Sequence, residues 1–481
     1  MTAPAGSSHD VVRTMFTRDT AYLGLWAAQL FGAAALTPVI SRLLATDEFG
    51  QVAAVNAVMQ VLFVVTGLGL ANALQRTFAQ ESGGVGDALR LVTLLILVAA
   101  LLTAVADVSG RWWGPPLGFD GYPEALHFAV LWGGVSAATA GCLALLRSQD
   151  RLLAFAAVSL LQSVVAEGLS VALVAAGSAT AARFVLGQLL AQLAALGVGL
   201  AFVRPLPVGL RHRPMARAAL SFGLPLVPAT LAALVLNAAD RLVVQHQLGE
   251  VQVARYQIAY NVGAMPMLLL GVLNSSWLPR LFGVRDLATR KEVLAASRDL
   301  LYRILGPVML GLSLGAPLVL RLWAPSSYRT DALTVVTTVV IVSAVPYTAG
   351  LAVSRLLLTD GRSRAVAAAT VIAAVGNVAL NLVLVPAAGL TGSALATLIA
   401  YAGLHGLLLR SVPTDLRVAA PSRALLLELA VCSVAAIVIA ELAPVGTAGL
   451  VVRSIAAAGC LVWFGQRVLQ AQGRRGRGVA A

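Results

Sequence analysis

Residues 221–282 read SFGLPLVPATLAALVLNAADRLVVQHQLGEVQVARYQIAYNVGAMPMLLLGVLNSSWLPRLF. This stretch contains two long apolar runs, which are separated by a short link that ends in Gly249. The first run carries two prolines and ends in Asp240-Arg241, and the second opens with Tyr256. Each run exceeds the roughly 20 residues that a helix needs to cross a bilayer. The stretch therefore predicts two membrane-spanning helices joined by a short link.

The composition of the whole chain is that of a membrane protein. Of its 481 residues, 59% are hydrophobic and only 11% are charged. A soluble domain carries roughly twice that charged fraction. The three cysteines lie within apolar runs, and neither their number nor their spacing indicates a disulfide framework or a zinc site. We therefore expect an all-α, polytopic membrane protein.

Apolar runs recur almost from end to end of the chain and predict about fourteen transmembrane helices. The predicted spans are Thr20–Ser41, Gln51–Leu70, Leu89–Ala106, Ala125–Leu146, Leu152–Ala176, Ala181–Val203, Ala216–Ala239, Gln252–Trp277, Leu300–Leu320, Ala332–Leu357, Ala365–Pro386, Leu390–Leu409, Ala424–Ala440 and Thr447–Leu469.

The positive charges predict the orientation of these spans. If the N-terminus lies in the cytoplasm, the inner segments hold 26 of the 34 Lys and Arg residues and the outer segments hold 8. This bias satisfies the positive-inside rule. We therefore expect a multi-pass protein of the cell membrane with both termini in the cytoplasm. The positive residues of the inner segments account for the net charge of +13, so this charge does not indicate nucleic acid as a partner.

The two halves of the chain contain an internal repeat. Arg42 is followed eight residues later by Gly50, and Arg241 is followed eight residues later by Gly249, an offset of 199 in both cases. Parallel repeats in transporters are related by an axis along the membrane normal, and the substrate path lies between them. The expected domains are an N-lobe of helices 1–6 (residues 1–203), a cytoplasmic linker (204–215), a C-lobe of helices 7–12 (216–411), and helices 13–14 with a basic tail (412–481).

Polar residues inside the predicted spans are the candidate functional residues, because a polar group that faces lipid is costly and usually faces the bundle interior or a wet cavity. Glu167 is the carboxylate near the middle of the first-half spans and is a candidate for ion coupling, as is Asp240. Three pairs of amides, each four residues apart, share a helix face: Asn56 and Gln60, Gln257 and Asn261, Asn377 and Asn381. Structural hydrogen bonding between helices is the alternative role for these amides.

Four arginines stand at repeat-related helix ends. Arg42 and Arg241 are predicted at the outer ends of helices one and seven, and Arg76 and Arg280 at inner ends. Arginine suits a polyanion because it is always charged and binds phosphate oxygens bidentately. The alternative roles of Arg42 and Arg241 are headgroup contact and pairing with nearby carboxylates.

Motifs for covalent chemistry are absent from the sequence. It contains no G-x-x-x-x-G-K-[ST] phosphate-binding loop and no H-E-x-x-H metal motif, and its five histidines are scattered. We therefore expect a transporter and not an enzyme, with no cofactor.

The opening stretch resembles the seventh and eighth helices of polysaccharide flippases in the multidrug/oligosaccharidyl-lipid/polysaccharide (MOP) exporter superfamily. Three further segments resemble the same family, and the likeness covers about residues 15 to 415, which leaves the last two helices outside the twelve-helix core. These segments are SRLLATDEFG (Ser41–Gly50), TGLGLANALQR (Thr66–Arg76) and GNVALNLVLVPAAGLTGSALAT (Gly376–Thr397).

The resemblance implies two six-helix lobes around a V-shaped, alternately open cavity. It also implies a function, which is to move undecaprenyl-pyrophosphate-linked glycans from the inner to the outer leaflet for surface polysaccharide biosynthesis. A polysaccharide polymerase and glycosyltransferases are then candidate partners. Under this reading Arg76 and Arg280 capture the pyrophosphate at the inner mouth, and Arg42 and Arg241 receive it at the outer mouth.

Two other functions of the superfamily remain as alternatives. Cation-coupled drug or metabolite antiporters use carboxylates inside helix one or within the core of the second lobe, but this chain has none in helix one, and Asp240 is predicted at a helix end. Lipid II flippases place arginines within the first helices, whereas Arg13 and Arg18 precede the first span here. Both departures favour a flippase for lipid-linked oligosaccharide.

Overall fold

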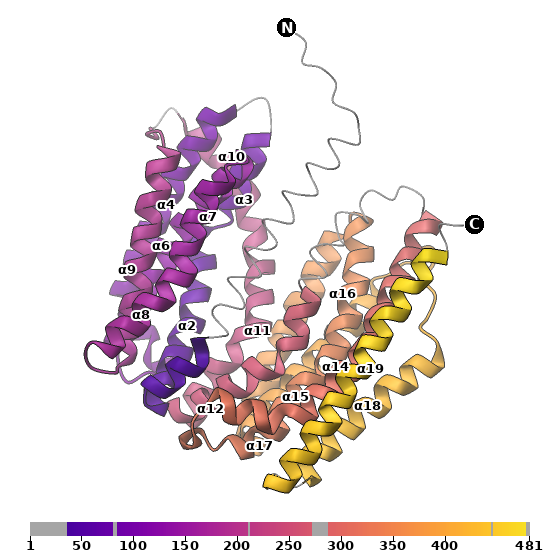
Figure 1. Cartoon of the computed structure of the whole chain (residues 1–481). Coiled ribbons are helices and arrows are strands. Elements are labelled where there is room, and N and C mark those ends of the chain that lie inside the picture. The colour runs from indigo at the N-terminus through magenta and orange to yellow at the C-terminus, as the bar shows by residue number, and fades with distance from the viewer. Residues whose placement is uncertain (1–35, 80–83, 210–211, 272–286, 444–445, 478–481) are drawn as a thin grey trace. The chain divides into compact units, whose positions relative to one another are not determined.

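A computed structural model describes residues 36–79, 84–209, 212–271, 287–443 and 446–477. Within these ranges the chain folds into helices joined by short turns, and no strand is present (Figure 1). The all-α prediction is therefore confirmed. The described chain divides into two compact units. Among the described residues, unit 1 comprises 36–43, 58–79, 84–110, 124–209 and 212–227, and unit 2 comprises 44–57, 111–123, 228–271, 287–443 and 446–477.

The helices of the first half, with a π-helical segment η2, follow one another with short connections. They are α2 (Thr46–Gly67), α3 (Leu70–Ala79), α4 (Gly84–Val108), α5 (Gly110–Trp113), α6 (Glu124–Ser148), α7 (Leu152–Leu160), η2 (Leu161–Val165), α8 (Ala166–Ala175), α9 (Ala181–Val203) and α10 (Arg213–Gly223). Helix α2 begins in unit 2 and continues into unit 1.

The helices of the second half are longer on average. They are α11 (Val227–Leu248), α12 (Glu250–Gly263), α14 (Leu287–Trp323), α15 (Thr334–Val342), α16 (Ala344–Thr359), α17 (Ser363–Arg410), α18 (Arg423–Leu442) and α19 (Thr447–Arg477).

Eleven helical segments in the described ranges are long and apolar enough to cross a membrane. They account for twelve of the fourteen predicted spans, because α17 contains both the eleventh and the twelfth. A kink at Ala388 and Gly389 separates these two, and Gly389 has a φ of 56°, a conformation that favours glycine. The first and eighth predicted spans fall partly outside the described residues.

The seventh predicted span needs a correction. The sequence predicted Ala216–Ala239, but α10 ends at Gly223, a short 3₁₀ turn carries Pro225, and α11 continues to Leu248. The prediction from hydropathy ends the span too early, because α11 continues through polar residues whose side chains are hydrogen-bonded inside the protein. Asp240 and Arg241 therefore lie inside a helix and not at its end.

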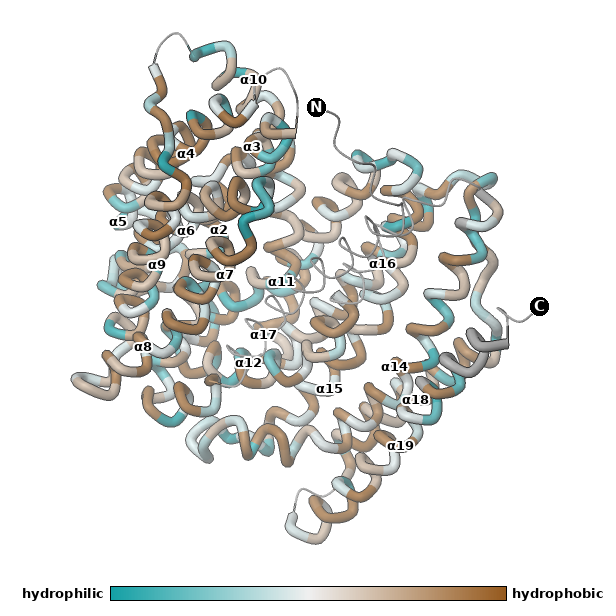
Figure 2. The backbone as a smooth tube through the Cα atoms, turned by 45° about the horizontal axis from the view of Figure 1, so that its top comes forward, coloured by the Kyte–Doolittle hydropathy of each residue, from teal (hydrophilic) through white to brown (hydrophobic). Residues whose placement is uncertain are grey.

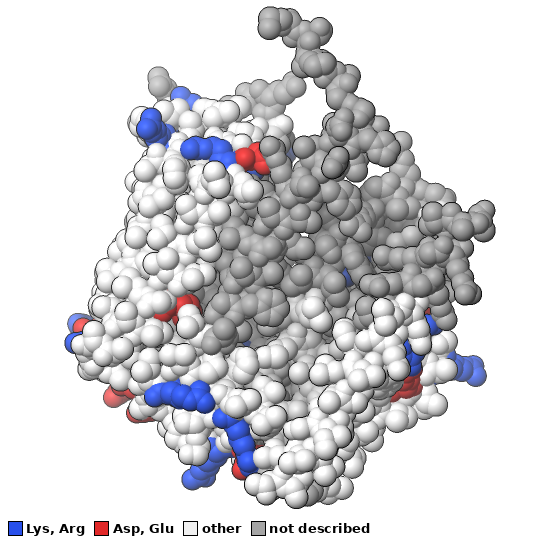
Figure 3. All heavy atoms as spheres, viewed as in Figure 1, with Lys and Arg blue, Asp and Glu red and all other residues white. Residues whose placement is uncertain are grey.

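Large apolar side chains on the outside of single helices show where lipid is expected. On α4, Leu97, Leu101 and Val105 are each more than half exposed and lie four residues apart, on one side of the helix. Exposed leucine and valine side chains also line α18 and α19. In Figure 2 brown, the hydrophobic colour, recurs along these helices, and among the described atoms visible in Figure 3 the white of uncharged residues predominates. These surfaces fit a multi-pass membrane protein.

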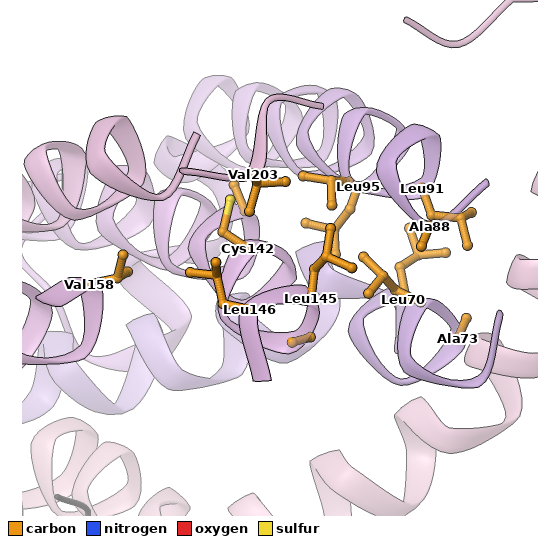
Figure 4. Packing of buried hydrophobic residues seen from close by; sticks show 14 of the residues in the cluster. Leu70, Ala73, Ala88, Leu91, Leu95, Cys142, Leu145, Leu146, Val158 and Val203 are labelled. Carbon is orange, nitrogen blue, oxygen red and sulfur yellow. The ribbon is translucent and has the colours of Figure 1, made fainter. Parts of the chain in front are cut away.

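The core of unit 1 is a cluster of mostly aliphatic side chains from α3, α4, α6, α7, α9 and α10 (Figure 4). Leu70, Leu91 and Leu145 are fully buried in it, and Cys142, which is also fully buried, lies beside Val203 in the same view. This packing makes unit 1 a compact helical body.

The last two helices belong to unit 2 and pack against α14. Arg453 of α19 is 4% exposed, and its guanidinium donates hydrogen bonds to the backbone carbonyls of Leu314 and Ser313, each at 3.3 Å. These carbonyl groups do not neutralise the charge of Arg453, but they accept the hydrogen bonds that its buried N–H groups donate. Arg453 ties α19 to α14.

Candidate functional site

The centre of the candidate site in unit 2 is the buried pair Asp240 and Arg241 on α11. Asp240 is 2% exposed and Arg241 is 7% exposed. The Arg241 Nη1 donates to Asp240 Oδ1 at 2.7 Å, and the Arg241 backbone N–H donates to the same oxygen at 3.0 Å. Tyr256 of α12 donates its hydroxyl to the other carboxylate oxygen at 2.6 Å. Three donors thus hold the carboxylate.

The guanidinium of Arg241 also contacts α12 along one face of that helix. Its Nε donates to Gln257 Oε1 at 3.0 Å, and its central carbon lies 4.0 Å from the ring centroid of Tyr260. Gln257 in turn donates to Asn261 Oδ1 at 2.6 Å. The predicted amide pair Gln257 and Asn261 and the predicted Asp240 and Arg241 therefore form one connected network.

Tyrosines from three helices enclose this network. Tyr401 of α17 donates its hydroxyl to Asn237 Oδ1 at 2.9 Å, and the Arg241 guanidinium donates to the Asn237 carbonyl one turn before it. The rings of Tyr347 and Tyr401 meet edge to face with centroids 5.3 Å apart. Tyr260 and Tyr401 are both buried. The network therefore joins α11, α12 and α17.

The electrostatics of this network are those of a compensated buried ion pair. Removing one partner of such a pair typically costs about 3–5 kcal/mol, because a charge is left buried without compensation. Arg241 is thus held in a fixed rotamer by a carboxylate, an amide and an aromatic face. A guanidinium binds carboxylate and phosphate groups with the same geometry. The arrangement can therefore bind an anion in place of Asp240.

A second group of polar residues lies at the kink of α17. Asn381 donates from Nδ2 to the Asn377 carbonyl at 2.9 Å, and its Oδ1 accepts from the Ser393 hydroxyl at 2.7 Å. All three residues are at most 1% exposed. Ser393 follows the kink, so this bond joins the two halves of α17. The predicted pair Asn377 and Asn381 is brought together, partly in the structural role that the sequence left open.

Glu167 lies in unit 1, at the start of α8 and directly after the π-helical segment η2. Its side chain has Gln188 of α9 as a hydrogen-bonding neighbour, while its Oε2 is buried without a partner among the described residues. One turn further along α9, Gln192 donates to Gln162 of η2 at 3.3 Å. A π-turn widens the helix by one residue and occurs often at functional sites. The result is a cluster of one carboxyl and three amides.

The remaining predicted residues lie elsewhere in the chain. Arg42 is exposed and donates to the Pro38 carbonyl of its own helix at 2.7 Å. Arg76 of α3 is exposed and lies 4.6 Å from the ring centroid of Phe222. Asn56 and Gln60 are half-buried on α2. Arg280 lies outside the described residues.

Several members of these clusters were not among the predicted site residues. Gln188 and Gln192 lie four residues apart in the sixth predicted span, so the rule that selected the other amide pairs would have found them. Tyr401 and Asn237 are 164 residues apart and carry no local signal. The described residues include no group of three or more His, Cys, Asp or Glu side chains that could hold a metal ion.

The fold resembles those of solved transporters, two of which are described as members of the MOP superfamily. The fold resembles a solved structure described as "Lipid II flippase MurJ, inward closed conformation" with a TM-score of 0.66 at 13% identity, over 96% of this chain and 99% of that one. It resembles a multidrug resistance MATE family transporter in an inward-facing conformation with a TM-score of 0.53 at 17% identity, over 81% and 92%. It also resembles a MOP superfamily transporter from Pyrococcus furiosus with a TM-score of 0.56 at 15% identity, over 82% and 95%.

Residues 39–332 match the model of a family described as polysaccharide biosynthesis protein. The match covers more than half of the 481 residues, and the chain belongs to this family. No curated protein matches the chain by sequence. The expected resemblance is therefore confirmed for the family and for the fold: the chain belongs to the polysaccharide biosynthesis protein family, and its fold resembles those of solved MOP-superfamily transporters.

Proposed function

We propose that this protein is a flippase that moves polyprenyl-pyrophosphate-linked oligosaccharide from the inner to the outer leaflet of the cell membrane, by alternating access. The observation that carries the proposal is its membership of the polysaccharide biosynthesis protein family. The MOP-type fold supports transport, and the buried arginine network of unit 2 supports an anionic substrate.

The substrate enters the proposal through Arg241. An incoming pyrophosphate would replace Asp240 as the anionic partner of the guanidinium, so the charge of Arg241 stays compensated throughout. Arg241 then keeps an anionic partner, and the displaced Asp240 carboxylate keeps the hydrogen bonds from the Tyr256 hydroxyl and from the Arg241 backbone N–H. The other proposed substrate-binding groups are further arginines and the amides that would bind hydroxyl groups of the sugars: Arg42, Arg76, Arg280, Asn56, Gln60, Gln257, Asn261, Asn377 and Asn381.

Coupling to an ion gradient is proposed at Glu167, with Asp240 as the second candidate. Glu167 has no ion pair with a described residue, and one of its oxygens has no hydrogen bond there. A carboxyl group in a membrane span with amides as its neighbours can take up and release a proton as its surroundings change. Asp240 is already paired with Arg241, so ion coupling through Asp240 would be linked to the binding of substrate.

The test is an assay of flipping in proteoliposomes. The purified protein is reconstituted with a fluorescent polyprenyl-pyrophosphate oligosaccharide, and a membrane-impermeant oxidant destroys the sugars that face outward. We expect the oxidant to reach substrate from both leaflets when the protein is present, and only from the outer leaflet in empty vesicles. If the same fraction of substrate escaped oxidation in both preparations, the proposal would be overturned.

Arg241 provides the variant for the same assay. Arg241→Lys keeps the charge and loses the bidentate fork, so we expect reduced flipping with a folded protein. Arg364→Lys is the matched control, because Arg364 is an exposed residue at the start of α17. Loss of flipping in both variants would argue against Arg241 as a substrate-binding residue.

Flipping of lipid II is the second candidate function. It is favoured by the likeness to the solved lipid II flippase, which covers 96% of this chain, whereas the likenesses to the MATE family transporter and to the Pyrococcus furiosus transporter cover 81% and 82%. The discriminating experiment offers both substrates in one preparation of proteoliposomes. Preferred flipping of lipid II would replace the first candidate with the second, and preferred flipping of the other oligosaccharide would exclude lipid II flipping as the main activity.

A further inference from the structure

One end of unit 2 contains a cavity of about 380 Å³ that lies apart from the Asp240 and Arg241 network. Seven aliphatic side chains and three arginines line it, from α14, α16, the end of α17 and the segment that follows α17. Its volume lies within the range of about 300–1,000 Å³ that is typical of small-molecule sites.

The apolar side of this cavity is continuous with a buried cluster. Leu294 of α14, Leu356 of α16 and Val412 line the cavity and also belong to a small hydrophobic core of unit 2. Val353 and Val418 line it as well and are only partly buried. The cavity therefore presents a fixed aliphatic wall that would accept hydrocarbon.

The three arginines play two different roles. Arg298 is engaged: it donates two hydrogen bonds to Asp299 Oδ1, at 2.9 and 2.7 Å, and a third to the Ala419 carbonyl at 2.7 Å. Arg298 thus ties the segment after α17 to α14. Arg410 and Arg417 are exposed, and neither forms an ion pair with a carboxylate in the described part of the chain. Two uncompensated positive charges therefore stand at the rim of an apolar cavity.

The position along the helices matches the depth of lipid headgroups. Arg410 is the last residue of a membrane-spanning helix, and Arg298 stands in the first turns of another candidate span, Lys291–Trp323. All three arginines lie in segments that the distribution of positive charge predicts to be cytoplasmic. The cytoplasmic leaflet is the one that carries anionic lipids, and basic pockets between transmembrane helices on that side bind their headgroups.

We infer that this cavity binds one anionic phospholipid of the inner leaflet, with its phosphate on Arg410 and Arg417 and the upper part of an acyl chain along Leu294, Leu356 and Val353. A phosphate ion alone would use the two arginines and leave the aliphatic wall in water, and a zwitterionic lipid such as phosphatidylcholine would bring a cationic group of its own beside the two positive charges. The inference does not depend on which glycan the protein moves.

The experiment measures lipid binding to the full-length protein in detergent by native mass spectrometry. Phosphatidylglycerol and phosphatidylcholine of equal chain length are titrated separately. We expect phosphatidylglycerol to bind with higher affinity, and the double variant R410Q/R417Q to weaken its binding by roughly 30-fold. The matched control is R364Q/R423Q, which removes two exposed arginines from other predicted cytoplasmic helix starts and should bind phosphatidylglycerol as the wild type does.

Two further arms identify the ligand. Val418→Trp should fill the cavity and weaken phosphatidylglycerol binding with both arginines in place, as expected for an acyl chain on the aliphatic wall. Inorganic phosphate should not displace the phospholipid at equal concentration, and neither should a polyprenyl pyrophosphate. Wild-type affinity in R410Q/R417Q, displacement by inorganic phosphate, or displacement by the polyprenyl pyrophosphate would each overturn the inference.

Discussion

Gln51 and Glu250 are 199 residues apart, which is the offset of the internal repeat, and they touch. The Gln51 Nε2 donates to Glu250 Oε1 at 3.2 Å. Each residue directly follows a repeat-related glycine, Gly50 or Gly249. The start of α2 and the start of α12 thus pack together inside unit 2, although the sequence places them in different halves of the chain.

Gly50 permits this approach, because a Cβ at this position would overlap the backbone carbonyl of Glu250. We expect Gly50→Ala to lower the thermal midpoint of unfolding, by an amount that corresponds to about 1–3 kcal/mol. The control is Gly197→Ala in α9, where a Cβ would meet nothing within 4 Å. Because alanine favours helix over glycine by up to about 1 kcal/mol, that variant should be unchanged or more stable. Equal midpoints for the two variants would contradict this account.

Glu250 should make the stability of this contact depend on pH. Burial raises the pKa of Glu250 above its ordinary value, and hydrogen bonds from Gln51 and Gln245 oppose the rise. The folded protein then holds this proton more tightly than the unfolded chain does, so its contribution is favourable at low pH and is lost as the pH rises through the raised pKa. We expect Glu250→Gln to raise the thermal midpoint at neutral pH and to change it less at pH values below about 4. If the gain in thermal midpoint were larger at low pH than at neutral pH, the predicted direction of the pH dependence would be wrong.

The Asp240 and Arg241 pair can be tested with a double-mutant cycle. We expect Asp240→Asn and Arg241→Gln each to destabilise the protein by about 3–5 kcal/mol, and the double variant to lose less than the sum of the two, because no unpaired charge is left. The exposed pair Asp360 and Arg362, at 2.8 Å, is the control and should contribute at most about 1 kcal/mol. Additive losses at Asp240 and Arg241 would show that the two residues do not interact.

Glu167 is expected to act in transport and not in folding. We expect Glu167→Gln to keep the wild-type thermal midpoint, since the amide preserves the size of the side chain and can bond to Gln188. Its rate of flipping should lose its dependence on an imposed proton gradient, measured in proteoliposomes with and without that gradient. The control is Gln192→Glu, which adds a carboxyl group at a different place, one turn along from Gln188 on α9. Gradient-dependent flipping by Glu167→Gln would reduce Glu167 to a packing residue.

The predicted topology is tested by cysteine labelling from outside the cell, in a variant without the three native cysteines. The turn at Gly118 and the kink at Gly389 are predicted outside, but both glycines have positive φ, and a Cβ at Gly118 would overlap His246. Asp120→Cys and Ala387→Cys are better probes, as both positions are exposed. An impermeant maleimide should label them and should miss Ser363→Cys and Thr414→Cys. Labelling of either of the latter two would break the predicted topology.

The helical fold could be read from the sequence, because membrane spans leave a continuous apolar signal. The kink at Gly389 and most span positions also follow from local rules. The end of the seventh span does not. Hydropathy stops at Asp240, yet α11 runs on to Leu248, since Asp240, Arg241 and Gln245 are buried and bonded to groups outside their own helix.

The candidate site shows the same division between local and distant contacts. The pairs Asn377 and Asn381, and Gln257 and Asn261, were found because residues four apart on a helix face each other whatever surrounds them. Tyr256 on Asp240, and Tyr401 on Asn237, come from other helices. Their partners were set by how the helices pack.

Composition and the spacing of apolar and positively charged residues were therefore enough to predict a many-helix membrane protein and to select Glu167, Asp240 and Arg241 as residues of interest. Whether Arg241 stands at a lipid headgroup or inside a buried network depended on the packing of α11 against α12 and α17. The physical reason is range: hydropathy and helix periodicity act within about one turn to one span of the chain, whereas the neutralisation of a buried charge is supplied by whichever helices the fold places beside it.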